Sequence, residues 1–433
     1  MPSIGWIPVP IAGLRPLRHR AFAVCWTAGA ASDLGTWVQL ATIGSLVAAS
    51  SGSAVEVGLI AAATFAPQGL GSPVGGVLAD RFDRRRLFLV TLAAQAVLTS
   101  GLALALFAGV RGAVPLALLV LVQSGAGAVG GPALQAVLPD LVPRRELTAA
   151  VSLQILGWNA GRVLGPLVAA LLVPIGAGWA VLANAVSFVV LWVAVALLRR
   201  RFPPPDGVRS SAGRELIEGA RVLGRTPGCR LAVATLLFVN LTYVPFMGLA
   251  PATARLLVEQ DASTPDDQAI ASVVGRLFAA QGIGAVLGSL VLATVLTRVR
   301  RSTVITVALG VAAALVAVHA QLPAVWLTMA AFALMGAASA TMFASFSGIV
   351  QRDAPVAQRG RVLSWQQGTG GLAYGVGLFV QGALADVVGL VPLFVGAGVL
   401  TAAVVVACRV APQWASIVDA ETVAPAHPVP ARA

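Results

Sequence analysis

The chain has 433 residues, of which 58% are hydrophobic and only 11% are charged. Soluble proteins carry roughly 25% charged residues and their cores stop growing near roughly 250 to 300 residues, so this composition excludes a soluble globular protein. At a mean hydropathy of +0.88, most of the chain requires a lipid bilayer as its solvent. The net charge of +12 does not indicate a nucleic-acid partner, because the cationic residues are all arginines in short clusters between apolar stretches.

Twelve apolar stretches are long enough to cross a bilayer, which takes a helix of about 20 residues. Their predicted ranges are 21–49, 55–79, 87–109, 114–138, 149–173, 179–198, 231–251, 271–296, 303–320, 324–350, 362–385 and 392–409. Nearly all arginines fall in alternate connections, and only Arg111 and Arg255 fall in the connections on the opposite side. Because positive charge stays in the cytoplasm, both chain ends are predicted to be cytoplasmic. The sequence therefore predicts an all-α, multi-pass protein of the bacterial inner membrane.

The segment from Arg199 to Arg230 divides the twelve predicted helices into six and six. It contains consecutive prolines at 203–205 and an amphipathic stretch at 215–223. The predicted organisation is a cytoplasmic tail (1–20), a six-helix bundle (21–198), a cytoplasmic connector (199–230), a second six-helix bundle (231–409) and a cytoplasmic tail (410–433).

The two predicted bundles have the pattern of a repeat. At an offset of 217 residues Arg81 aligns with Arg298, and at an offset of 212 residues Pro143 aligns with Pro355. Parallel six-helix repeats are typical of secondary transporters whose binding site lies near the middle of the membrane.

The connection after the second predicted helix contains a charged motif, Gly76-Val-Leu-Ala-Asp80-Arg-Phe-Asp83-Arg84-Arg. It resembles the signature loop of the major facilitator superfamily, G-x-L-x-D-R-x-G-R-R, with Asp83 where that pattern has glycine. Segments at 131–143, 184–188, 218–227 and 359–362 narrow the resemblance to the branch containing the enterobactin exporter and macrolide efflux proteins. The resemblance covers about residues 20–405 and implies a major facilitator fold that exports a small molecule using a proton gradient.

In that superfamily, contacts of the signature loop latch the two bundles together on the inner side. The resemblance implies a conformational latch here of Gly76, Asp80, Arg84 and Asp140. A carboxylate at Asp80 is suited to cap a neighbouring helix N-terminus, and Arg84 is suited to pair with a second carboxylate. The alternative is that the arginines of this loop only fix the topology beside anionic lipid.

The fifth predicted helix contains Gly161, Gly165 and Pro166, followed by Ala169 and Ala170. This stretch resembles the antiporter motif of drug exporters, G-x-x-x-G-P-x-x-G-G, with alanines at its last two positions. Small residues four apart let helices approach closely, and a proline bends a helix. The segment is therefore either an exporter-type hinge or an ordinary packing surface.

Two ionisable side chains, Asp33 and Arg162, lie at similar depths in the first and fifth predicted helices. Charged groups inside the hydrocarbon are costly and mark functional sites. We predict that Asp33 is the proton-coupling carboxylate and that Arg162 tunes it, with a permanent salt bridge as the alternative. Arg276 lies near the outer surface, where its long side chain is expected to reach the interface.

Polar and aromatic residues at mid-helix positions are candidates for a substrate cavity or for hydrogen bonds between helices. They are Trp37, Gln39, Gln123, Trp158, Asn159, Asn240, Tyr243 and Tyr374. Their apolar and aromatic surroundings favour an amphipathic substrate. The three histidines lack the spacing of metal ligands, and no Walker loop or nucleophile elbow occurs, so no cofactor, metal or catalytic residue is predicted.

The leading functional hypothesis is a monomeric, proton-coupled exporter of drugs, siderophores or other secondary metabolites. Its expected partners are the small-molecule substrate, protons and the lipid bilayer. The alternatives are a nutrient importer or facilitator, and a transporter-like scaffold or sensor that carries no flux. An integral-membrane enzyme is disfavoured because the sequence contains no catalytic cluster.

Overall fold

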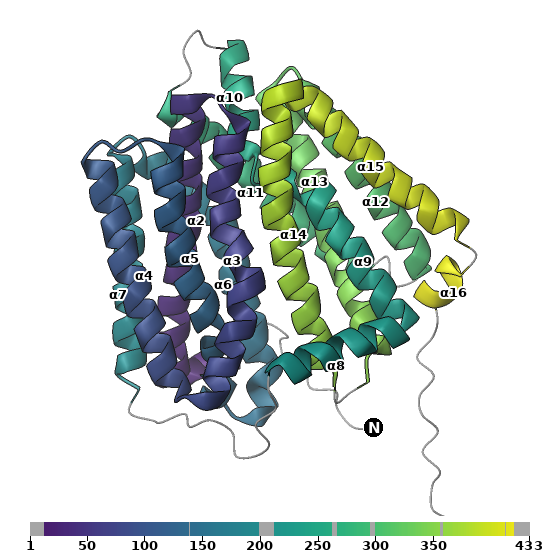
Figure 1. The fold of residues 1–433 in the computed structure, drawn as a ribbon, viewed down its shortest axis with the longest axis horizontal. Coiled ribbons are helices and arrows are strands. Elements are labelled where there is room, and N and C mark those ends of the chain that lie inside the picture. The colour runs from purple at the N-terminus through teal and green to yellow at the C-terminus, as the bar shows by residue number, and fades with distance from the viewer. Residues whose placement is uncertain are drawn as a thin grey trace, which may run out of the picture.

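A computed structural model describes residues 13–137, 139–198, 212–261, 266–294, 299–355, 358–411 and 413–419. Within these ranges the chain is helical and contains no strand (Figure 1). Most of the predicted N-terminal tail, the first part of the connector and most of the C-terminal tail lie outside the described residues. The all-α prediction is confirmed.

The long helices before the connector follow the predicted ranges closely. They are α2 (Arg20–Ser51), α3 (Ala54–Arg81), α4 (Arg84–Phe107), α5 (Ala113–Val137), α6 (Leu147–Leu172) and α7 (Ala177–Ala196). We call these six the N-terminal helices. Short 3₁₀ turns lie at η1 (Arg15–Arg18), η2 (Pro139–Leu141) and η3 (Arg144–Glu146).

The rest of the chain begins with the connector helix α8 (Ala212–Arg225), which includes the predicted amphipathic stretch. The C-terminal helices that follow are α9 (Pro227–Thr242), α10 (Ala250–Asp261), α11 (Asp267–Thr294), α12 (Arg301–Val318), α13 (Val325–Asp353), α14 (Arg359–Val388) and α15 (Leu390–Val410). Two 3₁₀ turns, η4 (Val244–Phe246) and η6 (His319–Gln321), interrupt them, and a short α16 (Trp414–Val418) ends the described chain.

Eleven segments of the described residues are long and apolar enough to cross a membrane. The first predicted span coincides with α2, which falls outside this group although it has 32 residues. Polar side chains such as Asp33, Gln39 and Thr42 lower its hydropathy, and they face other helices. A multi-span membrane protein is therefore confirmed, and the count of twelve spans stays a prediction.

The seventh predicted helix, 231–251, is not continuous. α9 ends at Thr242, the chain turns through η4, and α10 begins at Ala250. Pro245 cannot donate a backbone hydrogen bond and its ring crowds the preceding turn, which explains why the α-helix does not run through this point. The Tyr243 hydroxyl fixes the break by donating to the Met335 carbonyl of α13 at 2.8 Å.

Two helix pairs form the largest contacts between the N-terminal and the C-terminal helices: α3 packs against α14, and α6 packs against α11. α6 begins at Leu147 and α14 at Arg359, which is the same offset of 212 residues found in the sequence. In the two predicted repeats α3 corresponds to α11, and α6 corresponds to α14. The contact of α3 with α14 therefore corresponds to the contact of α11 with α6. This is the arrangement expected of two repeats related by a pseudo-twofold axis.

The two ends of the molecule are distinguished by short helices. α8 and α16 lie at one end, which the arginine distribution assigns to the cytoplasm, and α10 lies at the opposite end (Figure 1). We call them the inner end and the outer end. α8 contacts α14, α9 and α3, so it connects the inner ends of helices from both sets.

Reporter fusions test this orientation. A fusion after Asp206, in the connector, is expected to be active only with a cytoplasmic reporter, and one after Asp266, before α11, only with a periplasmic reporter. The paired enzymatic signals of the two reporters measure the difference. Equal signals at both positions would contradict the assigned topology.

Candidate functional site

Five aromatic rings meet between the two sets of helices. Trp37 of α2 lies 5.4 Å from Trp158 of α6, 5.9 Å from Phe65 of α3 and 6.2 Å from Phe278 of α11, measured between ring centroids. Phe65 in turn lies 5.0 Å from Tyr374 of α14. The four helices of the two main joining pairs, together with α2, therefore contribute to one aromatic cluster, in the spacing range of favourable ring pairs.

A small apolar cavity of about 20 Å³ lies beside this cluster, so the space between the two sets of helices is nearly closed in this structure. It is lined by Trp37, Leu40, Ala41, Gly44, Val57, Ile60, Ala61, Pro166, Met247, Gly248, Pro251, Val274 and Phe278. These residues come from α2, α3, α6, α10, α11 and the break between α9 and α10. A concave, mostly apolar site between two halves of a protein is a typical place for a small ligand.

Asp33 lies one helical turn from Trp37 on α2, on the side toward the inner end. Its Oδ2 is 3.7 Å from the position that a Cβ on Gly157 of α6 would occupy. The carboxylate is only partly exposed and makes no hydrogen bond or ion pair within the part of the chain that the structure describes.

Arg162 lies on α6 between Trp158 and Pro166, four residues from each, so the three share one face of the helix. Its Nε is buried and has no hydrogen-bond partner among the described residues. Asp33 and Arg162 are on neighbouring helices but are not within ion-pair distance of one another in this structure.

Gly161 and Gly165 bring α6 against α2. A Cβ on Gly161 would lie 3.0 Å from the Asp33 carbonyl carbon, and one on Gly165 would overlap the Cβ of Trp37. The third hinge residue, Pro166, lines the cavity, and its carbonyl lies 3.0 Å from the Cβ position of Gly275 on α11. The predicted hinge segment is thus the point where α2, α6 and α11 meet.

The other predicted cavity residues make contacts within one set of helices. Gln39 of α2 donates to Gln123 of α5 at 3.2 Å and accepts from Asn184 of α7 at 2.7 Å. These buried amides form a polar network inside the N-terminal helices. For Gln39 and Gln123, the structure therefore shows hydrogen bonds between helices, the second of the two roles considered from the sequence.

The remaining three lie apart from the aromatic cluster or bond locally. The amides of Asn159 and Asn240 each donate to a carbonyl of their own helix, at 2.8 and 2.7 Å. The Tyr243 side chain is fully buried among the C-terminal helices and also contacts Ser339 at 3.1 Å. Of the eight predicted cavity residues, Trp37, Trp158 and Tyr374 belong to the cluster.

Phe65 and Phe278 were not among the residues predicted from the sequence, because the predicted aromatic residues were limited to tryptophans and tyrosines, which carry a polar atom. Neither phenylalanine carries a signal that separates it from the lipid-facing ones. Arg276, two residues before Phe278, is exposed, and its Nε bonds the Ser272 carbonyl of its own helix at 3.3 Å. It lies outside the cluster.

The residues of the predicted latch lie at the inner end. Gly76 and Asp80 are on the last turns of α3, Arg84 starts α4, and Asp140 is exposed in η2. The Asp80 side chain is outside the described part of the structure. A Cβ on Gly76 would meet nothing within 4 Å, so close packing does not require glycine there.

Two other residues of the signature loop have defined contacts. Asp83, which replaces the glycine of the pattern, is the N-cap of α4 and accepts from the Arg86 amide at 2.9 Å. Arg85 donates to the Val195 and Ala196 carbonyls at the end of α7, at 3.0 and 2.5 Å. Arg85 thus satisfies a helix C-terminus, a role beyond topology alone.

These features agree with what the chain resembles. A family profile described as transmembrane secretion effector matches residues 11–431. The chain belongs to this family of the major facilitator superfamily. The multidrug efflux pump Tap of Mycolicibacterium fortuitum is 29% identical over 84% of this chain and 88% of that protein. The enterobactin exporter EntS of Escherichia coli O1:K1 is 27% identical over 71% of each chain.

Solved structures show the same fold. The nucleoside transporter NupG superposes with a TM-score of 0.71 at 14% identity, covering 89% of this chain and 98% of that one. An inward-facing bacterial homologue of the human lysosomal transporter Spinster superposes with a TM-score of 0.68 at 14% identity, covering 94% and 97%. The predicted major facilitator fold is confirmed.

The packing of α6 on α2 can be tested with Gly165→Ala. The added Cβ overlaps the Cβ of Trp37 and lies 2.9 Å from the Trp37 carbonyl carbon, so the two helices must separate. We expect a loss of about 1–3 kcal/mol in stability, typical of overpacking, seen as a lower unfolding temperature in detergent. Gly125→Ala on α5 is the control, because its Cβ meets nothing within 4 Å. Equal unfolding temperatures for both variants would argue against this close contact.

Proposed function

We propose that the protein exports small amphipathic molecules in exchange for protons, by alternating access. The observation that carries the proposal is the apolar cavity and the adjoining aromatic cluster between two repeat-related sets of helices. Asp33 and Arg162 lie next to the cluster. Charged groups inside a membrane are ordinarily paired, whereas Asp33 and Arg162 have no ion-pair partner among the described residues, which favours a functional role for them. The names of the relatives Tap and EntS support export as the direction.

The moving units in this proposal are the bundles 21–198 and 231–409. Rocking of one bundle against the other exposes the cavity to each side in turn. Gly161, Gly165 and Pro166 serve as the place where α6 tilts against α2 and α11. The inner latch of Gly76, Asp80, Arg84 and Asp140 holds the inner end closed while the cavity is open to the outside.

Proton coupling is assigned to Asp33. In the present structure Arg162 is not paired with it, which fits a state in which Asp33 holds its proton. When Arg162 approaches, its permanent positive charge stabilises the carboxylate and the proton leaves to the cytoplasm. The cycle then carries a proton inward for each substrate moved outward.

The aromatic cluster supports an amphipathic substrate with a flat apolar part. Offset or edge-on contacts with Trp37, Trp158 and Tyr374 favour ring systems over sugars, which need many hydrogen-bond donors and acceptors. A monomer suffices, because one chain supplies both halves of the cavity. A nutrient importer, and a scaffold without flux, are the alternatives that a transport assay decides between.

The variant Asp33→Asn tests the coupling. An amide at this position keeps the shape but cannot exchange a proton, so we expect substrate to bind while proton-driven accumulation falls at least tenfold. The measurement is uptake of a fluorescent amphipathic dye into inverted vesicles, with and without a proton gradient. Glu56→Gln, at the outer start of α3, is the control and is expected to transport normally.

Three results would contradict the proposal in different ways. Full proton-driven accumulation by Asp33→Asn would remove Asp33 as the coupling site. Accumulation by the wild-type protein only into right-side-out vesicles would indicate an importer. Absence of flux for every dye that binds the purified protein would favour the scaffold reading.

A further inference from the structure

The turn between α2 and α3 lies at the outer end and contains backbone groups that have no partner within their own helix. α2 ends at Ser51 and α3 begins at Ala54, with Gly52 and Ser53 between them. The last carbonyls of one helix and the first amides of the next therefore lie side by side. Such groups need partners, and the aligned peptide dipoles favour a cation at the first site and an anion at the second.

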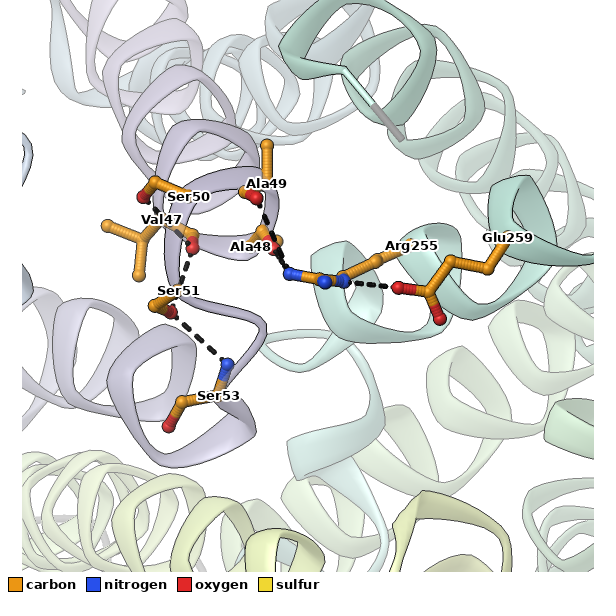
Figure 2. Close-up of polar contacts among 8 residues, drawn as sticks. All are labelled: Val47, Ala48, Ala49, Ser50, Ser51, Ser53, Arg255 and Glu259. Atoms are coloured by element: carbon orange, nitrogen blue, oxygen red, sulfur yellow. Dashed lines mark hydrogen bonds and ion pairs between the residues drawn. The ribbon is translucent and has the colours of Figure 1, made fainter. Parts of the chain in front are cut away.

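Arg255 of α10 binds the C-terminal end of α2, as Figure 2 shows. Its Nη1 donates to the Ala48 carbonyl at 2.6 Å and to the Ala49 carbonyl at 3.4 Å. The Nε of the same guanidinium donates to Glu259, one turn along α10, at 2.6 Å. Glu259 thereby orients the cation toward the helix end.

Gly52 makes room for this contact. Its φ of +69° is a left-handed conformation that other residues adopt only with strain. A Cβ at Gly52 would also lie 2.7 Å from Nη1 of Arg255 and 2.9 Å from its Cζ. The glycine thus ends α2 and lets the guanidinium reach the carbonyls behind it.

Asp386 of α14 binds the start of α3. Its Oδ1 accepts from the Ala54 amide at 2.6 Å, and its Oδ2 accepts from the Val55 amide at 3.3 Å and from the Ser53 hydroxyl. The Asp386 carboxylate thus accepts three hydrogen bonds at the start of α3. Charge-assisted hydrogen bonds of this kind are about twice as strong as neutral ones.

Both contacts cross between the two sets of helices, because α10 and α14 are C-terminal helices whereas α2 and α3 are N-terminal ones. A third crossing pair joins Arg111 with Asp267 at 3.1 Å, and because the Arg111 side chain is 61% exposed its contribution to stability is small. A cleft of about 190 Å³ borders Arg255, Glu259 and Asp386 and opens toward solvent. Water can therefore hydrate both charges when the contacts break, which lowers the cost of release.

We infer that Arg255 and Asp386 form an outer clamp: they hold the α2–α3 turn and keep the cavity closed to the outside, and its release is the step that opens the outer end. The role of the clamp in transport rests on the proposed alternating access. The contacts themselves need neither substrate nor protons. Reciprocal binding of both ends of one turn makes the closure specific, because no shifted position of the turn satisfies both charges.

The clamp is tested by thiol accessibility in intact cells. A background with Cys25, Cys229 and Cys408 replaced by alanine receives Ala41→Cys, a buried position that lines the apolar cavity. A membrane-impermeant maleimide added outside should react slowly. In Asp386→Asn and in Arg255→Gln we expect at least tenfold faster alkylation, and Arg255→Lys should restore part of the closure.

The chain contains matched controls for both residues. Asp419 caps α12 by accepting from the Ser302 amide and hydroxyl, and Arg352 donates to the Ile417 and Val418 carbonyls at the end of α16. These contacts have the same chemistry but stay within the C-terminal part of the chain. Asp419→Asn and Arg352→Gln should therefore leave the alkylation of Ala41→Cys unchanged.

Two outcomes would overturn the inference. The first is unchanged alkylation in both Asp386→Asn and Arg255→Gln. These variants act at different helix ends, so the test does not depend on the folding of a single variant. The second is equal acceleration in the matched controls, which would show general loosening. Because no substrate or gradient is used, failure of Asp33 as the coupling site would leave this result standing.

Discussion

The low polarity of the bilayer is the constraint on which this structure depends. Backbone groups inside the hydrocarbon cannot rely on water, and the free amides and carbonyls at helix ends need partners as well. Arg85 at the end of α7, Arg255 at the end of α2 and Asp386 at the start of α3 meet this need with side chains from other helices. Contacts that satisfy helix ends therefore also decide which helices stay together.

The low polarity of the bilayer also affects the region around the cavity, where two charged side chains lie close to tightly packed helices. Close approach of α2 and α6 at Gly161 and Gly165 excludes lipid and water from the region around Trp37. Asp33 and Arg162 lie at or near this contact without an ion-pair partner in the part of the chain that the structure describes, and the cost of charge there is high. A rearrangement that pairs them, hydrates them or adds a proton changes the energy of the whole contact, which is how a small ion can drive a large motion.

The sequence predicted the helices well because hydropathy over a long window reports the bilayer directly; the range 55–79 corresponds to α3, Ala54–Arg81. It did not predict the break after Thr242 because α9 and α10 are both apolar there. It also treated Arg255 as a topology marker and Gln39 as a cavity candidate. Their roles depend on contacts such as Arg255 with Ala48, which join segments about 200 residues apart in sequence and leave no local pattern.

The break at η4 has a mechanical consequence for the outer clamp. α10, which carries Arg255, is not joined to α9 by a continuous ladder of α-helical hydrogen bonds. Tyr243 anchors the end of α9 to α13, and η4 separates this anchor from α10. The position of Arg255 in the proposed outer clamp therefore depends on the packing of α10 against α11 and α2, and not on a helix continuous with α9.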